Sequence, residues 1–122
     1  MRVALPDAFL ARPIAHRGYH DSSLGRIENS PAAFAAAVHR GYGIELDLQL
    51  SSDGVAMVFH DETLDRLTGK HGPLNAWTAA ELGALRLTGS ADTIPTLAQV
   101  LAQVAGRVPL LIEIKDQSLT MS

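Results

Sequence analysis

Three carboxylates stand at strand spacing in two apolar segments of the chain. Glu45 and Asp47 are two residues apart among Leu and Ile, and Glu113 and Lys115 have the same spacing near the other end. Because residues i and i+2 of a strand point to one face, each pair shares a face. Buried carboxylates need a partner or a metal ion, and oxygen ligands suit a hard divalent cation. The pattern predicts a cation site formed by Glu45, Asp47 and Glu113.

The side chains that could do chemistry stand at the ends of strand-like segments. His16 and Arg17 follow the first segment, and His60 follows the third. In parallel α/β folds, chemistry collects at the carboxyl ends of the strands. We therefore expect these residues to meet the acidic side chains at one end of a sheet.

Strand-like and helical segments alternate along the chain. Expected strands cover residues 13–16, 43–50, 55–59 and 109–115, and expected helices cover 31–40, 78–85 and 95–104. Asn29 or Ser30 would cap the first helix, Thr78 and Glu81 would form a capping box, and Gly106 would end the last helix. The turn at 52–54 fits an antiparallel hairpin or a reversal at a barrel rim. The alternation predicts an α/β fold with a parallel sheet covered by helices.

Composition limits the classes of function. The chain has 122 residues, of which 47% are hydrophobic, and a net charge of −3, which suits one domain and gives no general attraction to nucleic acid. Cysteine is absent, so thiolate metal sites and disulfides are excluded. No apolar run approaches a membrane span, and Pro6 and Asp7 interrupt the N-terminus before a signal segment develops. We expect a single cytoplasmic domain.

Each candidate residue also has an ordinary structural explanation. Alternating acids occur on edge strands with a solvated face. Glu113 could form a local salt bridge with Lys115, and Arg17 could pair with Asp21 or Glu28. A histidine after an apolar strand is more often structural than catalytic.

Six short motifs, taken in order, give the sequence a family resemblance. They are His16-Arg17-Gly18, Glu28-Asn29-Ser30, Glu45-Leu46-Asp47-Leu48-Gln49 with Ser52-Asp53-Gly54, His60-Asp61, Leu67-Thr68-Gly69 and Ile112-Glu113-Ile114-Lys115. Together they resemble glycerophosphodiester phosphodiesterases across residues 13–117. The resemblance implies a TIM barrel, and since such a barrel takes roughly 250 residues, residues 1–122 would form a single partial domain, the first half.

The resemblance implies roles for five of these residues. Glu45, Asp47 and Glu113 would ligate a divalent cation, Mg²⁺ or Ca²⁺. His16 and His60 would be the general acid and base, which suits imidazoles because they titrate near neutral pH.

The resemblance further implies a phosphate-binding set and a reaction. Arg17, Asn29 and Lys115 would bind the phosphate of the substrate. The reaction would be hydrolysis of a glycerophosphodiester to glycerol 3-phosphate and an alcohol, an activity of lipid metabolism. Either water or the neighbouring hydroxyl of the substrate's glycerol could attack first.

Two other functions are compatible with the sequence. The chain runs seven residues past Lys115, so a half barrel with two open edges could be a catalytically idle module that binds metal or forms a homo-oligomer. If the chain is instead part of a longer enzyme, the 122 residues should show little activity by themselves. A glycosidase also uses paired carboxylates, but Arg17, Lys115 and two histidines supply more positive charge than its chemistry needs.

Overall fold

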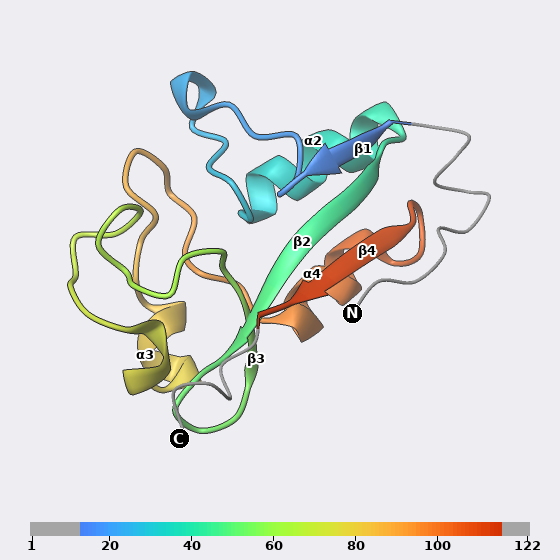
Figure 1. Ribbon diagram of the computed structural model, residues 1–122. Helices are drawn as coiled ribbons and strands as arrows, with labels where there is room; N and C mark the ends of the chain where they lie inside the picture. The colour runs from blue at the N-terminus through green and yellow to red at the C-terminus, as the bar shows by residue number, and fades with distance from the viewer. Residues whose placement is uncertain (1–12, 116–122) are drawn as a thin grey trace.

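The computed structural model describes residues 13–115, which form a small sheet with the helices of residues 31–40 and 97–104 on one face (Figure 1). The elements are β1 (Ile14–His16), the 3-10 helix η1 (Ser22–Leu24), α2 (Pro31–Arg40), β2 (Gly43–Leu50), β3 (Ala56–Val58), the 3-10 helix η2 (Leu74–Ala76), α3 (Ala79–Gly83), α4 (Leu97–Val104) and β4 (Leu110–Ile114). The predicted α/β class with about four strands is confirmed. None of the helices between residues 13 and 115 has the length and apolar character needed to cross a membrane.

Strand β2 is the centre of the sheet. Strands β1 and β4 run parallel to it, and β3 pairs antiparallel with its last residues. The parallel sheet predicted from the alternation is confirmed for β1, β2 and β4, and of the two alternatives left open for the turn at 52–54 the antiparallel hairpin is the one that forms. The reason is the short connection, because residues 51–55 cannot form the crossover of a dozen or more residues that a parallel pair requires. Within the described residues, β1 and β4 pair with β2 alone, so each has an open outer edge.

The helix starts follow the capping signals in the sequence. Ser30 caps α2, and its side chain accepts a hydrogen bond from the N–H of Ala33. The helix ends at Gly41, whose φ of 71° is the left-handed conformation that glycine adopts at low cost. Thr78 and Glu81 form the predicted capping box of α3. Local sequence therefore sets where these two helices begin.

The end of α4 agrees with the prediction, because its last residue is Val104. Ala105 is the C-cap, with a φ of 50°, and its N–H donates to the carbonyl of Leu101. Gly106 follows with a φ of 74°. Two successive residues with positive φ reverse the chain here, so the helix ends at Val104 as predicted and Gly106 completes the reversal.

The two faces of β2 have different neighbours. Ile44, Leu46 and Leu48 are buried in one core cluster with residues of α2 and α4. Glu45 and Asp47 point to the opposite face, because successive residues of a strand alternate. A second core cluster around Phe59 lies beneath the loops of residues 60–95. The helices thus hold β2 from behind and leave its acidic face to form a site.

Candidate active site

Three carboxylates converge on the face of the sheet that the helices leave open. Asp47 of β2 lies opposite Glu113 of β4 in the parallel register, and Glu45 is two residues before Asp47. One oxygen from each of the three side chains lies within 4.8 Å of the others. Glu45 and Asp47 are buried, and β2 has a paired strand on both sides. These two acids therefore do not lie on the solvated face of an edge strand. The acidic side chains are therefore close enough to share a cation.

Several oxygens at this cluster have no hydrogen-bond donor. Among the described residues, Glu45 Oε2, Asp47 Oδ1 and Asn29 Oδ1 are buried side-chain atoms without a partner. A buried acceptor that lacks a donor is costly, so each such atom needs an explanation. Carboxylate and amide oxygens are the ligands that Mg²⁺ and Ca²⁺ prefer. The donor set fits a hard divalent cation.

Asn29 faces the acidic cluster from the loop before α2. Its side-chain Nδ2 donates to Asp47 Oδ2 at 3.1 Å, and its backbone N–H donates to the carbonyl of Arg17 at 2.8 Å. Both Asn29 and Arg17 have left-handed backbones, with φ of 56° and 57°, a conformation that asparagine tolerates and that is uncommon for arginine. The sequence predicted a phosphate contact for Asn29. Here its amide donor is directed at Asp47.

Burial and like charge act together on Glu45. Burial, and then the negative charges of Asp47 and Glu113, raise the pKa of Glu45 to about 7, although a hydrogen bond from the Arg17 N–H opposes the rise. The carboxyl group therefore holds a proton near neutral pH unless a positive charge enters the cluster. Cation binding would then release that proton, since metal ligands must be deprotonated.

The raised pKa of Glu45 predicts a stability change with pH. The ordinary value is 4.5 and the folded value about 7, so between these the folded chain keeps a proton that the unfolded chain has released. Without cations, stability should fall as pH rises through this window, by up to about 3 kcal/mol. Glu45→Gln should remove this loss and be more stable than the wild type at pH 8, with little difference at pH 4. Urea unfolding in chelator measures both.

A matched substitution controls for the loss of one acidic group. Glu62→Gln changes an exposed loop residue in the same way and should leave the pH dependence unchanged. A Glu45→Gln variant that is less stable than the wild type at pH 8 in chelator would contradict the predicted repulsion.

The two histidines approach the acidic face from different strands. His16 ends β1, with Nε2 3.7 Å from Glu45 Oε1 and a side chain that is 65% exposed. His60 follows β3, and its Nδ1 is 2.9 Å from Asp61 Oδ1. Because β3 runs antiparallel, it returns the chain to the level of Asp47, whose carbonyl accepts the N–H of Phe59. His60 thus reaches the site by a hairpin rather than at the carboxyl end of a parallel strand.

Arg17 and Lys115 bring positive charge to the cluster. The Nη1 of Arg17 donates to Glu28 at 3.2 Å, and its Nε lies 3.6 Å from Asp47 Oδ2. The Nζ of Lys115 lies 3.6 Å from Asp47 and 3.8 Å from Glu113. The ion pairs proposed as ordinary explanations, Arg17 with Glu28 and Lys115 with Glu113, are both present. Each cation also faces Asp47, so pairing does not remove it from the site.

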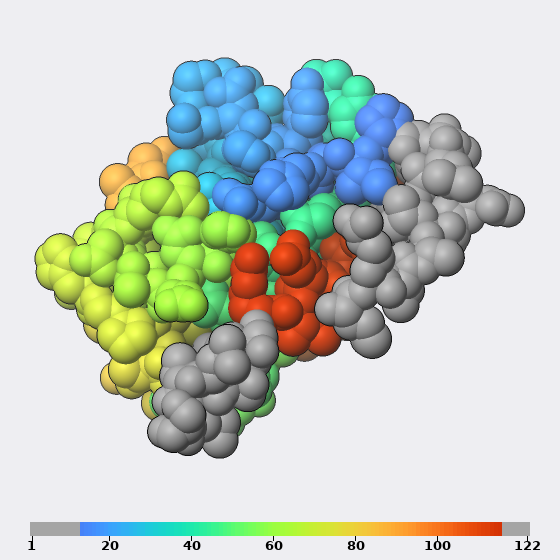
Figure 2. All heavy atoms as spheres, in the orientation of Figure 1, coloured from blue at the N-terminus to red at the C-terminus, as the bar shows by residue number. Residues whose placement is uncertain are grey.

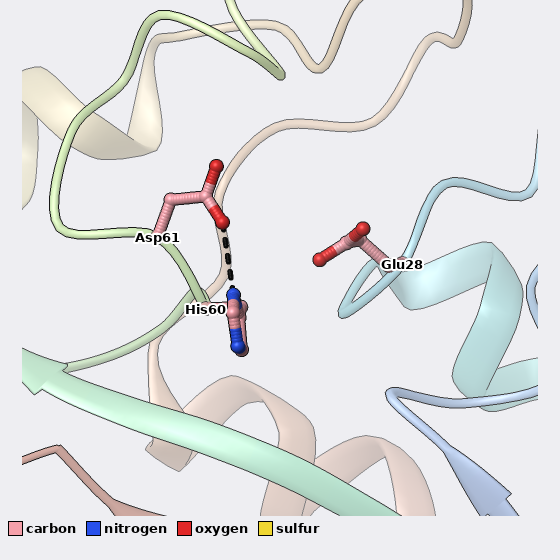
Figure 3. Close-up of side chains that lie close together, drawn as sticks. All are labelled: Glu28, His60 and Asp61. Carbon is pink, nitrogen blue, oxygen red and sulfur yellow. Dashed lines mark hydrogen bonds and ion pairs between the residues drawn. The ribbon is translucent and has the colours of Figure 1, made fainter.

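A second group of acids lies beside His60, and an arginine that the sequence did not single out occupies it. Figure 3 shows Glu28 and Asp61 coming from separate loops toward the same space, with His60 next to Asp61. Arg66 donates hydrogen bonds to both acids. Its side chain sits where a cation would, so we do not assign a metal to this group. The position of Arg66, in a loop, gave no sequence signal for this role.

The charges of this second group fix its protonation. A hydrogen bond from Arg66, with further help from His60, outweighs burial and lowers the pKa of Asp61 to about 2. Burial acts to raise the pKa of Glu28, but the hydrogen bond and charge of Arg66 and the charge of Arg17 leave it below its usual value. The two acids in turn raise the pKa of Arg66. All three are charged at neutral pH.

Gln49 belongs to one of the family motifs, but no role is predicted for it from the sequence. It is 3% exposed, and its Nε2 donates to the carbonyls of Phe59 at 2.8 Å and Asp61 at 2.6 Å. A signal for it existed, because Gln49 continues the two-residue spacing of Glu45 and Asp47. Figure 2 shows the segments around the acidic face, with the red β4 next to the yellow-green loop after β3 and separated from the blue N-terminal segment by green atoms, as expected for β2 between β1 and β4.

Comparison with known proteins gives one family. The profile of the glycerophosphoryl diester phosphodiesterase family matches residues 16–122. A glycerophosphodiester phosphodiesterase of Bacillus altitudinis is 38% identical over 113 residues, which are 87% of this chain and 45% of that protein. The chain spans about half the length of the curated relatives it matches.

Solved structures agree with this similarity. A glycerophosphodiester phosphodiesterase from Agrobacterium tumefaciens aligns with a TM-score of 0.77 and 35% identity, over 86% of this chain and 47% of that one. A phosphodiesterase of Oleispira antarctica, solved with its product sn-glycerol-3-phosphate, aligns with a TM-score of 0.76 and 32% identity, over 88% and 47% of the two chains.

Proposed function

Since the chain belongs to the glycerophosphoryl diester phosphodiesterase family and its fold is the first half of a TIM barrel, we propose that it serves the metal-dependent hydrolysis of glycerophosphodiesters. The products would be glycerol 3-phosphate and an alcohol. One observation carries the proposal, the convergence of Glu45, Asp47 and Glu113 within 4.8 Å. The glycerol 3-phosphate bound to the Oleispira antarctica relative supports the class of product. A preference for Mg²⁺ or Ca²⁺ and a cytoplasmic location stay predictions.

Glu45, Asp47 and Glu113 would hold the cation, whose positive charge would stabilise the non-bridging oxygens of the phosphate. Arg17 and Lys115 would add to this stabilisation, because both already face Asp47 at 3.6 Å and would turn toward an incoming anion. Asn29 would orient Asp47 through its amide. This chain would thereby supply both the ligands and the cations for the phosphate.

The two histidines would move the protons of the reaction. One imidazole accepts the proton of the attacking hydroxyl as its oxygen bonds to phosphorus. The other donates a proton to the leaving alkoxide as the second phosphorus–oxygen bond breaks. The partial burial of His60 and the exposure of His16 give the two rings different surroundings. The attacking hydroxyl could belong to water or to the glycerol of the substrate.

Product release tests the proposal. The 122-residue protein is incubated with glycerophosphodiesters, and glycerol 3-phosphate is measured with added Mg²⁺ or Ca²⁺ and with chelator. We expect release that depends on the cation. Calorimetric binding of either cation without any release would instead favour the catalytically idle metal-binding module or part of a longer enzyme, which would show little activity alone. Inhibition by sugar analogues but not by phosphate would favour a glycosidase.

The open edges of the sheet favour one addition to this proposal, a homo-oligomer. Strands β1 and β4 pair with β2 alone in the described part of the chain, and Ile114 at the end of β4 is 75% exposed. Unpaired edges favour pairing with a second chain. Two copies could place β4 of each beside β1 of the other. Sedimentation that gives a monomer at micromolar concentration would rule this out.

A further inference from the structure

Arg66 connects two loops that both border the proposed site. Its Nη1 and Nη2 donate to the two oxygens of Glu28 at 2.8 and 2.9 Å. Its Nε and Nη2 donate to the two oxygens of Asp61 at 2.8 and 3.0 Å. The planar guanidinium therefore makes a two-point contact with each carboxylate, the geometry in which arginine pairs are strongest and most directional. Asp61 is held in one orientation.

The fixed carboxylate determines which nitrogen of His60 carries the proton. Asp61 is ionised at neutral pH, so it can only accept hydrogen bonds. Its Oδ1 lies 2.9 Å from His60 Nδ1, and that nitrogen must therefore be the donor. A neutral imidazole carries a single N–H, which leaves Nε2 with a free lone pair. The geometry thus selects one of the two neutral forms of the ring.

The backbone around His60 is held independently of Asp61. Gln49 donates to the carbonyls of Phe59 and Asp61, the residues on either side of His60. Because Gln49 lies on β2, these two hydrogen bonds fix the loop of His60 to the central strand of the sheet. The ring is therefore fixed at both its backbone and its Nδ1 atom.

We propose that Arg66 is a positioning residue, which clamps Asp61 so that His60 keeps its proton on Nδ1 and presents Nε2 as the atom that accepts a proton. The step assigned to Nε2 is simple. The O–H bond of the attacking hydroxyl breaks, its proton moves to the Nε2 lone pair, and its oxygen bonds to phosphorus; the phosphorus–oxygen bond to the leaving alkoxide breaks, and the alkoxide takes its proton from the other histidine. The catalytic meaning of this arrangement rests on the proposed function, whereas the form of the ring does not.

The form of the ring is measured directly by NMR. In ¹⁵N spectra of the 122-residue protein above the titration of its histidines, the wild type should show a protonated Nδ1 and an unprotonated Nε2 at His60. Arg66→Met should lose this single-form signature, because an unclamped Asp61 no longer holds the Nδ1 proton. Arg66→Lys keeps the charge but has a single donor atom, so it should restore the signature in part.

A matched control keeps the test specific. Arg86 is an exposed arginine, and Arg86→Met should leave the His60 signature unchanged. The wild-type spectrum tests the proposal even if the Arg66→Met variant does not fold. A protonated Nε2 on neutral His60 of the wild type would by itself overturn the proposal. A folded Arg66→Met variant with an unchanged signature would overturn it as well.

The rate of hydrolysis separates this proposal from the proposed function. Arg66→Met should lower kcat on the order of tenfold to 100-fold, the size of the loss when partners that orient metal-ligating imidazoles are removed, with little change in KM. An Arg66→Met kcat equal to that of the wild type would overturn the positioning role. The predicted NMR signature in a protein that releases no glycerol 3-phosphate would support the clamp and contradict hydrolysis by this chain alone.

Discussion

Asp47→Asn is expected to abolish the stabilisation that Mg²⁺ or Ca²⁺ gives the chain. Asp47 is 1% exposed, lies opposite Glu113 and has one oxygen without a hydrogen-bond donor. A cation at 100 times its dissociation constant stabilises a folded protein by about 2.7 kcal/mol. For a domain of this size, this corresponds to roughly 10 °C in melting temperature. The variant should lose this shift, because an amide replaces the central carboxylate of the cluster.

Melting curves with increasing cation concentration measure this effect, and Asp65→Asn is its control. Asp65 is an exposed acid that pairs with His71, away from the cluster, so its substitution should leave the cation-induced shift unchanged. Circular dichroism verifies that Asp47→Asn folds. An equal shift in Asp47→Asn and the wild type would show that the cation does not bind at this cluster. The proposed function would then lose its main support.

The second large effect is expected at His60. His60→Gln should reduce kcat for glycerophosphodiester hydrolysis by about 10²- to 10⁴-fold, the usual contribution of a general acid or base. The cation-induced shift in melting temperature should stay the same, because the imidazole contacts Asp61 rather than the three clustered acids. Release of glycerol 3-phosphate and melting curves on the same preparation measure the two quantities.

His71→Gln is the matched control for that variant. The side chain of His71 is 86% exposed and pairs with Asp65 on the surface, so its loss should change neither rate nor melting shift. Wild-type activity in His60→Gln would contradict a proton-transfer role. A parallel loss of the cation-induced shift would mean that the substitution disturbs the acidic cluster instead.

Regular spacing made part of the site readable in the sequence. The pairs Glu45–Asp47 and Glu113–Lys115 follow the period of a strand, and an acid on a buried strand demands a partner, so their convergence could be predicted. The starts of α2 and α3 could also be predicted, because the side chains of the caps Ser30 and Thr78 accept hydrogen bonds from nearby residues of their own helices. These features depend on neighbours in the sequence and on one repeating geometry.

Long-range contacts were not readable in the same way. Arg66 reaches Glu28, which is 38 residues away, and nothing in a loop of mixed polar residues specifies that pairing. The antiparallel course of β3 depends on a short turn that is compatible with two geometries, and the sequence left both open. The direction of the Asn29 amide toward Asp47 also depends on tertiary packing. Contacts of this kind are set by the assembled fold.

The central place of β2 determines how the acidic face responds to local opening. Sheets lose structure from their outer strands first, and β2 has neighbours on both sides as well as helices behind it. The amide protons of Glu45 and Asp47 should therefore be among the slowest to exchange with solvent. Glu113 lies on β4, an outer strand of the described sheet, so its position should fluctuate more than those of Glu45 and Asp47. A cation could therefore bind first to Glu45 and Asp47 on the rigid strand β2, and Glu113 would complete its coordination when β4 pairs with β2.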